Sequence, residues 1–259
     1  MTEAAVDVLV PAAAEAVPST RPRWLRRLLG NHSVVAGALI LLVFVLAAIL
    51  AGVLSTHNPT RLAPASRLLP PSARHILGTD EFGRDIWSLV LYGSRISLLV
   101  GVTTMLLTSI GGIVVGLVAG YSRRLDMVVM RVMDGLMAIP SILLAIAVVS
   151  LSGASLMTVL VAITIPEIPR VARLVRSVVL SAREEPYVEA AISVGSSLPK
   201  IMWRHLMPNT VAPLIVQGTY VCASAVLTEA ILSFLGAGIN PETPTWGNIM
   251  AEGRAYFQI

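Results

Sequence analysis

Five long apolar stretches alternate with polar segments along the 259 residues. An apolar run of about 20 residues is long enough for a helix to cross the hydrocarbon core of a bilayer. The pattern therefore predicts an all-α, polytopic membrane protein with five spans. The expected spans are residues 34–54, 96–119, 135–151, a fourth that begins near Ser155, and 211–232.

Prolines and charges mark particular positions in these spans. Pro140 removes a backbone donor inside the third span, so we expect a kink there. The fourth span ends with Arg170, Arg173 and Arg176, which share one helix face. These arginines are expected to anchor the helix at the cytoplasmic surface.

Composition supports a membrane protein. Only 13% of the residues are charged and 55% are hydrophobic, whereas soluble domains carry roughly 25% charged residues. The net charge of +4 comes from arginines beside the apolar spans, so the expected partner is membrane lipid and not nucleic acid. The single cysteine, Cys222, excludes a disulfide within the chain, and the four histidines show no metal-ligand spacing. No metal site is predicted.

The distribution of basic residues predicts the topology. With the amino terminus inside, the inner segments hold thirteen of the nineteen Lys and Arg residues: four between 21 and 27, three between 123 and 131, and six between 170 and 204. Inner loops of membrane proteins are enriched in these residues. Residues 176–209 are therefore expected to lie in the cytoplasm.

The segment 55–95 contains four prolines between residues 59 and 71 and is expected to form an external loop with a short helix near its end. Thr79 or Asp80 is expected to cap that helix. Its predicted membrane-surface face comprises Ile86, Trp87, Leu89, Val90 and Tyr92.

Four further charged residues are candidates for a role in or beside the apolar spans. Asp126, Arg131 and Asp134 are spaced to form a local charge network at the start of the third span. Glu229 lies near the outer end of the fifth span, where an ionisable side chain is costly. It is a candidate for the translocation pathway or for contact with a partner subunit, but bonding to neighbouring helices is the alternative.

The cytoplasmic segment 189–209, EAAISVGSSLPKIMWRHLMPN, predicts a helical hairpin. Pro186 suits the first turn of a helix, and Gly195 can end that helix in a left-handed cap. Tyr187, Val188, Ala191 and Val194 are expected to share one face. A second helix is predicted to begin at Ser196 or Ser197 and to end before Pro208. An amphipathic loop lying on the lipid surface is the alternative.

Residues 189–208 resemble a known family motif. Glu189-Ala190-Ala191, then Gly195, then His205-Leu206-Met207-Pro208 resembles the EAA loop of binding-protein-dependent ABC importer permeases. That motif ordinarily ends in Ile-x-Leu-Pro, so His205 and Met207 depart from it. Residues 75–85, HILGTDEFGRD, resemble the external LGTD-x-x-GRD motif of DppC/OppC-type dipeptide and oligopeptide permeases, and segments 230–238 and 244–247 are similar to the same branch.

The resemblance implies a type I ABC importer transmembrane fold in the bacterial cytoplasmic membrane. It implies a cytoplasmic tail over residues 1–30, a first transmembrane helix and external loop over 31–95, and a permease core over 96–259 with the coupling loop at about 181–209. Relatives have a sixth span after the Trp246-Gly247 motif, whereas five spans are expected in the sequence given. The implied substrate is a dipeptide or oligopeptide, with nickel chelates, glutathione or another small solute as alternatives.

The resemblance also implies partners and site residues. The expected partners are a second homologous permease of DppB/OppB type, two ABC ATPase subunits and an extracytoplasmic substrate-binding protein. ATP and Mg²⁺ are expected in the ATPases, because this chain lacks the G-x-x-x-x-G-K-[ST] phosphate loop. The chain is therefore expected to be a non-hydrolytic subunit without a cofactor of its own. A stand-alone channel or secondary carrier is a less favoured alternative, because no internal repeat is found.

Two groups of residues follow from the two motifs, both without catalytic residues. The expected ATPase-coupling residues are Tyr187, Glu189, Ala190, Ala191, Gly195, His205 and Pro208. The expected external-motif residues are Gly78, Thr79, Asp80, Gly83, Arg84 and Asp85.

Overall fold

The computed structural model describes residues 30–256, and over that range the chain is helical. These residues contain no β-strand, only an isolated bridge between Thr79 and Asp85. The all-α prediction is therefore confirmed for the described residues. The tail predicted over residues 1–30 lies almost wholly outside them.

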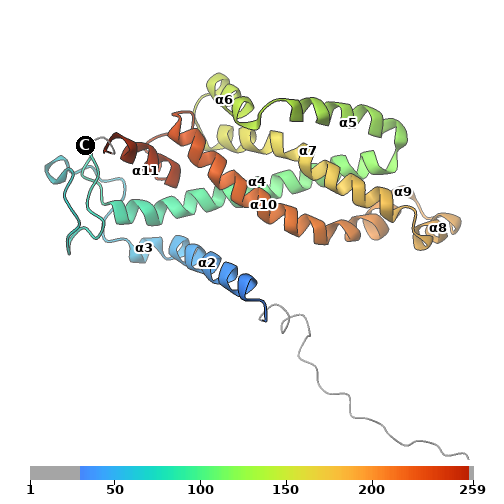
Figure 1. Cartoon of the computed structure of the whole chain (residues 1–259), viewed down its shortest axis with the longest axis horizontal. Coiled ribbons are helices and arrows are strands. Elements are labelled where there is room, and N and C mark those ends of the chain that lie inside the picture. Colours follow the sequence, from blue (N-terminus) through green and yellow to red (C-terminus); the bar gives the residue numbers. More distant parts are fainter. Residues whose placement is uncertain (1–29, 257–259) are drawn as a thin grey trace, which may run out of the picture. The chain divides into compact units, whose positions relative to one another are not determined.

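Most of the helices follow one another with short connections, whereas residues 55–85 form a long loop between α3 and α4 (Figure 1). The α-helices are α2 (His32–Ile49), α3 (Ala51–Leu54), α4 (Ile86–Tyr121), α5 (Arg123–Ala138), α6 (Ser141–Ser152), α7 (Leu156–Ala182), α8 (Pro186–Ser193), α9 (Leu198–Ile201), α10 (Met207–Phe234) and α11 (Trp246–Gly253). Shorter pieces are the 3-10 turns η1 (Pro64–Ser66) and η3 (Arg254–Tyr256) and the π-helical turn η2 (Met202–Leu206).

Among the described residues, three helices are long and apolar enough to cross a membrane: α2, α4 and the continuous helix from Leu198 to Phe234. The pair α5 and α6 makes a fourth candidate, bent by 86°. The helix α7 has 27 residues, but Glu167 and three arginines follow its apolar first half. The expected fourth span thus coincides with α7, although it is less apolar than the others, and the predicted count of five is approximate.

The bend between α5 and α6 lies where the sequence predicts a kink. The helix α5 ends at Ala138, and Pro140 immediately precedes α6. Proline disfavours helical geometry at the residue before it, and Ile139 accordingly has extended backbone angles (φ −90°, ψ 127°). The prediction of a kink at Pro140 is confirmed.

The helix α4 packs along α7, and α10 packs against both (Figure 1). Gly112 and Gly116 of α4 face Val171 and Val175 of α7, and Gly120 continues the row one turn later. Small residues at this spacing let two helix backbones approach closely. A side chain as small as alanine at Gly116 would meet α7 at less than van der Waals distance.

The start of α4 differs from the prediction. The external loop was expected to end in a separate surface helix capped by Thr79 or Asp80, but α4 runs unbroken from Ile86 to Tyr121. Its cap is Asp85, whose side chain accepts a hydrogen bond from the backbone N–H of Ser88 at 2.9 Å. The expected surface face is only partly correct, because Leu89 is buried while Ile86, Trp87, Val90 and Tyr92 are half-buried.

The second arm of the predicted hairpin also differs. The helix was expected to end before Pro208, but it continues through η2 into α10. Proline within a helix lacks its N–H and clashes with the carbonyl four residues earlier. A π turn changes the hydrogen-bond register at this point, and Asn209 Nδ2 donates to the His205 carbonyl at 2.6 Å. The helix therefore passes Pro208 without stopping.

Candidate functional site

The predicted cytoplasmic hairpin lies at one end of α7 and α10, opposite the end that carries α11 (Figure 1). Pro186 occupies the first turn of α8, as predicted. Gly195 has φ +78°, its N–H donates to the Ile192 carbonyl, and the Ser196 N–H donates to the Ala191 carbonyl. This pair of bonds is a Schellman cap. The predicted stop at Gly195 is confirmed.

The hairpin is fixed to the helical core through one side and exposed on the other. Val188, Ile201 and Leu206 are buried in the cluster that also contains Val171 and Val175 of α7. By contrast, the expected coupling residues Glu189 and Ala190 are exposed, and Ala191 is half-buried.

The predicted apolar face of α8 is only partly correct. Val188 and Ala191 face the core, but Val194 is 85% exposed and Tyr187 is 43% exposed. The helix ends at Ser193, so Val194 lies at its C-cap and no longer follows the helical face.

Two of the expected coupling residues, Tyr187 and His205, lie close together where α8 approaches the start of α10. The rings of Tyr187 and His205 lie 6.2 Å apart, and Pro208 is in the first turn of α10. Asn209, which the sequence analysis did not single out, donates from Nδ2 to the Tyr187 hydroxyl at 3.0 Å. These contacts connect α8 directly to α10.

The arginines of α7 pair with acidic residues and do not form a free surface stripe. Arg176 donates to Asp126 through both Nε and Nη2, and Arg173 donates to Asp134 at 2.6 Å. Arg170 pairs with Glu167 on its own helix. The predicted local network of Asp126, Arg131 and Asp134 is therefore wrong, since its two carboxylates pair with α7 and Arg131 has no ion pair among residues 30–256. Pairing between helices could not be inferred from spacing along α5.

The external motif folds into one compact turn before α4. Thr79 Oγ1 donates to the Ser66 carbonyl and accepts from the Leu69 N–H. Asp80 accepts from the backbone N–H of Arg84 at 2.7 Å and from its Nε at 2.6 Å. The turn closes only because two of its residues lack side chains: Gly78 and Gly83 have positive φ and approach the backbone of Leu69 and Ala63 respectively.

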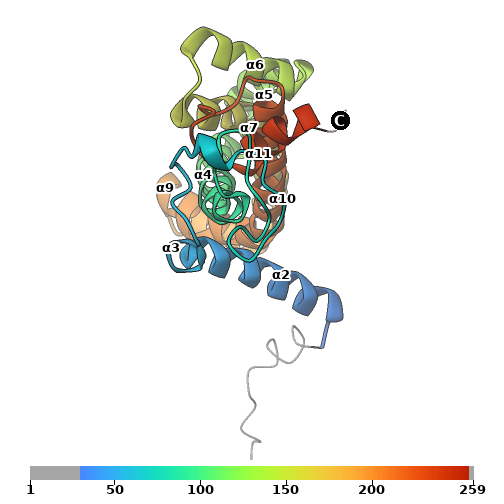
Figure 2. The same cartoon turned by 90° about the vertical axis from the view of Figure 1, so that its left-hand side faces the viewer.

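Arg84 connects this turn to α11, which lies beside α4 and α10 (Figure 2). Its Nη2 donates to Glu252 Oε2 at 2.7 Å, and the Trp246 indole N–H donates to the Val90 carbonyl of α4. Burial raises the pKa of Glu252, although the Arg84 guanidinium opposes that shift. The external motif and α11 therefore form one bonded assembly at this end of the chain.

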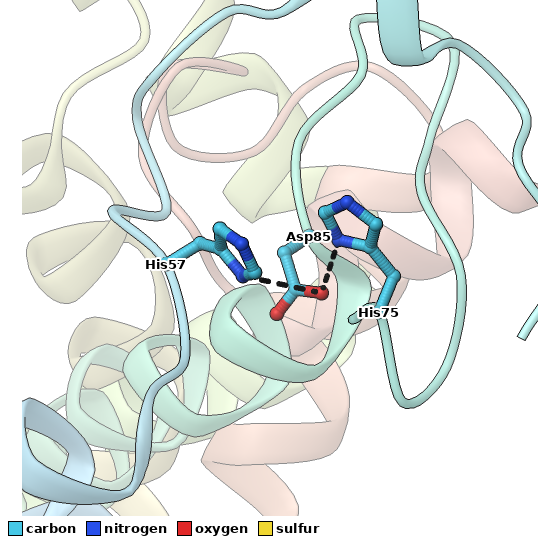
Figure 3. A group of neighbouring side chains, drawn as sticks. All are labelled: His57, His75 and Asp85. Carbon is cyan, nitrogen blue, oxygen red and sulfur yellow. Dashed lines mark hydrogen bonds and ion pairs between the residues drawn. The ribbon is translucent and has the colours of Figure 1, made fainter. Parts of the chain in front are cut away.

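Asp85 also brings together two histidines that sequence spacing did not connect (Figure 3). Its Oδ1 lies 3.0 Å from His75 Nδ1 and 4.0 Å from His57 Nδ1, and the two imidazole rings stack with centroids 4.6 Å apart. Burial alone would raise the pKa of Asp85, but hydrogen bonds from Ser88, His75 and Thr56 outweigh it and hold the pKa below its usual range. The sequence did not indicate this grouping, because the two histidines and Asp85 are far apart along the chain.

Glu229 is fully buried in α10. Its Oε1 accepts a hydrogen bond from Ser233 Oγ at 2.8 Å, and Oε2 has no hydrogen-bond partner among the described residues. The same Ser233 contacts Gly247 of α11. Glu229 thus lies beneath the α10–α11 junction.

Comparison of the sequence with known proteins identifies two matching family models. A family model described as binding-protein-dependent transport system inner membrane component matches residues 112–259. A second, the N-terminal TM domain of oligopeptide transport permease C, matches residues 22–71.

Several curated proteins are similar over most of the chain. A probable peptide ABC transporter permease protein, y4tQ, from Sinorhizobium fredii is 47% identical over 253 residues, which are 97% of this chain and 86% of the relative. The dipeptide transport system permease protein DppC from Alkalihalophilus pseudofirmus is 42% identical over 90% of this chain and 77% of its own. The di/tripeptide transport system permease protein DppC from Pseudomonas aeruginosa is 38% identical over 93% of this chain and 82% of its own.

Proposed function

Because this chain belongs to the family of inner-membrane components of binding-protein-dependent transport systems, we propose that it is the translocating subunit of an ATP-driven importer of dipeptides or oligopeptides. The chain is a multi-pass inner-membrane protein. The peptide substrate is proposed because the relatives described above carry peptide transport in their names.

The observation that carries the proposal is the exposed hairpin at the cytoplasmic end of α7 and α10. Glu189 and Ala190 are exposed on α8, and the Schellman cap at Gly195 holds the turn that presents them. A short helix with small residues on its outer side fits into a cleft, and an exposed carboxylate pairs with a basic group there. We assign the receiving cleft to an ATPase subunit.

The hairpin is built to transmit displacement to the spans. Only residues 183–185 separate α7 from α8, and the second arm is continuous with α10. Buried Val188 and Leu206 keep the hairpin from sliding over the core. A movement imposed on α8 by closure of the ATPases would therefore tilt α7 and α10 together and switch the pathway between outward- and inward-facing states.

The remaining functions of the transporter are assigned to other subunits. Two ABC ATPases would hold ATP and Mg²⁺, a second homologous permease would complete the pathway, and an extracytoplasmic binding protein would deliver the peptide. The external motif and α11 form the bonded assembly at the outer end, which supports its assignment as the contact surface for the binding protein or the second permease. Glu229 stays a predicted pathway residue, with its burial beneath α11 supporting the alternative of a helix-joining role.

Substitutions in the hairpin test the proposal. Glu189→Lys reverses the exposed charge, and Gly195→Leu forces a branched side chain into positive φ, where it is strained. Both variants are expected to insert into the membrane in normal amounts but to lose uptake of a labelled dipeptide. The matched controls are Glu184→Lys, an equal charge reversal at an exposed position before α8, and Gly195→Asn, which tolerates the left-handed conformation. Uptake at the wild-type rate by both Glu189→Lys and Gly195→Leu would contradict the proposed coupling role.

A further inference from the structure

The cluster of His57, His75 and Asp85 has no part in the coupling mechanism proposed above. It lies at the outer end of α4, and its three residues come from three segments: the loop after α3, the loop before the external turn, and the N-cap of α4. One ligand atom from each residue lies within 4.8 Å of the other two. We propose that these residues form a binding site for a divalent transition-metal ion, with Zn²⁺ as the best match.

The two oxygens of Asp85 are used differently, and this difference supports a metal site. Oδ2 accepts hydrogen bonds from Ser88 N, Ser88 Oγ and Thr56 Oγ1 at 2.7 to 3.1 Å. Oδ1 faces only the two imidazoles (Figure 3). A carboxylate with one oxygen fixed by hydrogen bonds and the other directed at histidines is the arrangement of a metal ligand with an ordered second shell.

The two imidazoles have different hydrogen-bond partners: His75 Nδ1 lies 3.0 Å from Asp85 Oδ1, and His57 Nδ1 lies 3.0 Å from Thr56 Oγ1, which itself donates to Asp85 Oδ2. The ring of His57 stacks on that of His75 at an interplanar angle of 26°, and its Nδ1 also points toward Asp85 Oδ1. A metal ion between the two imidazoles and the carboxylate would use all three groups.

The distances fit a metal after small movements. At a tetrahedral zinc, ligand atoms bound at 2.0–2.2 Å lie about 3.3 Å from one another. The two measured separations from Asp85 Oδ1, 3.0 and 4.0 Å, lie on either side of that value. His57 Nδ1 must exchange its hydrogen bond with Thr56 Oγ1 for the ion and approach by less than about 1 Å, and it belongs to a loop.

The site also has an entry path. The side chain of Asp85 is fully buried and that of His75 is 10% exposed, but that of His57 is 34% exposed. His57 and Thr56 line a cavity of about 640 Å³ that extends to Arg95 and Pro244. An ion can enter from this side, and a water from the cavity can fill a fourth position. Bound metal would join the loop at residue 57 to the start of α4, whichever solute the protein transports.

The test is Zn²⁺ binding by the full chain, purified with its co-purifying subunits through a tag without histidines. After chelator treatment, competition with a chromophoric zinc indicator is expected to give about one ion per chain. His57→Gln and His75→Gln are expected to weaken binding by at least about 100-fold, and Thr56→Val by about 10-fold through the second shell. His32→Gln and Cys222→Ser, which alter two other potential metal ligands of the chain, are the controls and should bind as the wild type does. Excess Ca²⁺ or Mg²⁺ should not compete, because both prefer all-oxygen sites.

Two results would overturn the proposal. One is equal zinc affinity in the wild type and in His57→Gln, which would mean adventitious binding. The other is the absence of binding in the wild type, which would leave the cluster as a hydrogen-bonded clasp between loops. Should His75→Gln fail to fold, Co²⁺ added to the wild type gives an independent readout, since a tetrahedral site produces intense visible absorption. Only weak octahedral absorption would also count against the site.

Discussion

Replacing Gly116 by alanine should push α4 and α7 apart, and the resulting loss of stability follows from the geometry of their contact. A Cβ at residue 116 would lie 2.6 Å from the Cβ of Val175 and 2.7 Å from the backbone carbonyl oxygen of Ala172. Ordinary van der Waals contact begins at 3.4 Å, so the helices must move apart by about 0.8 Å. The carbonyl cannot rotate away as a flexible side chain can.

The expected change in the free energy of unfolding has two opposing contributions. Overpacking of a well-packed interface costs about 1–3 kcal/mol, whereas Gly→Ala in a helix gains up to about 1 kcal/mol. Gly135→Ala in α5 isolates the second part, because nothing lies within 4 Å of its added Cβ. The free energy of unfolding of Gly116→Ala should therefore fall below that of Gly135→Ala by about 1–3 kcal/mol.

The assay is unfolding in mixed micelles by increasing sodium dodecyl sulfate, followed by the fluorescence of the four tryptophans. A second substitution, Val175→Ala, removes the Cγ1 methyl, which the new Cβ would approach to 2.8 Å, but keeps the Val175 Cβ and the Ala172 carbonyl, so it relieves part of the clash. It should be less damaging in the Gly116→Ala background than in the wild type, and the double-mutant cycle measures that coupling. Equal stability of Gly116→Ala and Gly135→Ala, with no coupling to Val175, would refute the close approach of α4 and α7.

Three further predictions concern polar contacts. Asp126→Arg or Arg176→Asp alone should lower the free energy of unfolding by about 1 kcal/mol, and the charge-swapped double variant should recover part of that loss; no recovery would argue against direct pairing. Arg84→Gln leaves the Glu252 carboxylate without its partner, so limited proteolysis should cut the external loop faster than in the wild type. An unchanged cleavage rate would contradict a stabilising role for the Arg84–Glu252 ion pair. If Glu229 serves the pathway, Glu229→Gln should lower the maximal uptake rate without altering the amount of folded protein; unchanged uptake kinetics would favour its helix-joining role.

Local chemistry was enough to predict the elements whose ends depend on one or two residues. Pro186 begins α8, Gly195 ends it in a left-handed cap, and Pro140 separates α5 from α6. Each outcome follows from the restricted backbone of a single proline or the permissive backbone of a single glycine. The external motif and α11 contain fewer such single-residue signals.

Features that depend on contacts between segments could not be predicted. The helix start at Asp85 was missed because Thr79 and Asp80, equally good caps, are instead engaged in the external turn. The partners of Asp126 and Asp134 lie on α7, and the grouping of His57 with His75 requires the fold of the whole external loop. Spacing along one helix carries no information about such pairs.

The proposed coupling role is tested most directly by identifying the proteins that bind the hairpin. The tagged chain would be purified gently from its own membrane, and its stoichiometric partners identified by mass spectrometry. We expect recovery of a second permease and two ATPases, with the ATPases lost when Glu189→Lys and Gly195→Leu are combined and retained in the Glu184→Lys control. Recovery of the chain alone or as a homo-oligomer, with uptake driven by an ion gradient, would contradict the proposed coupling role.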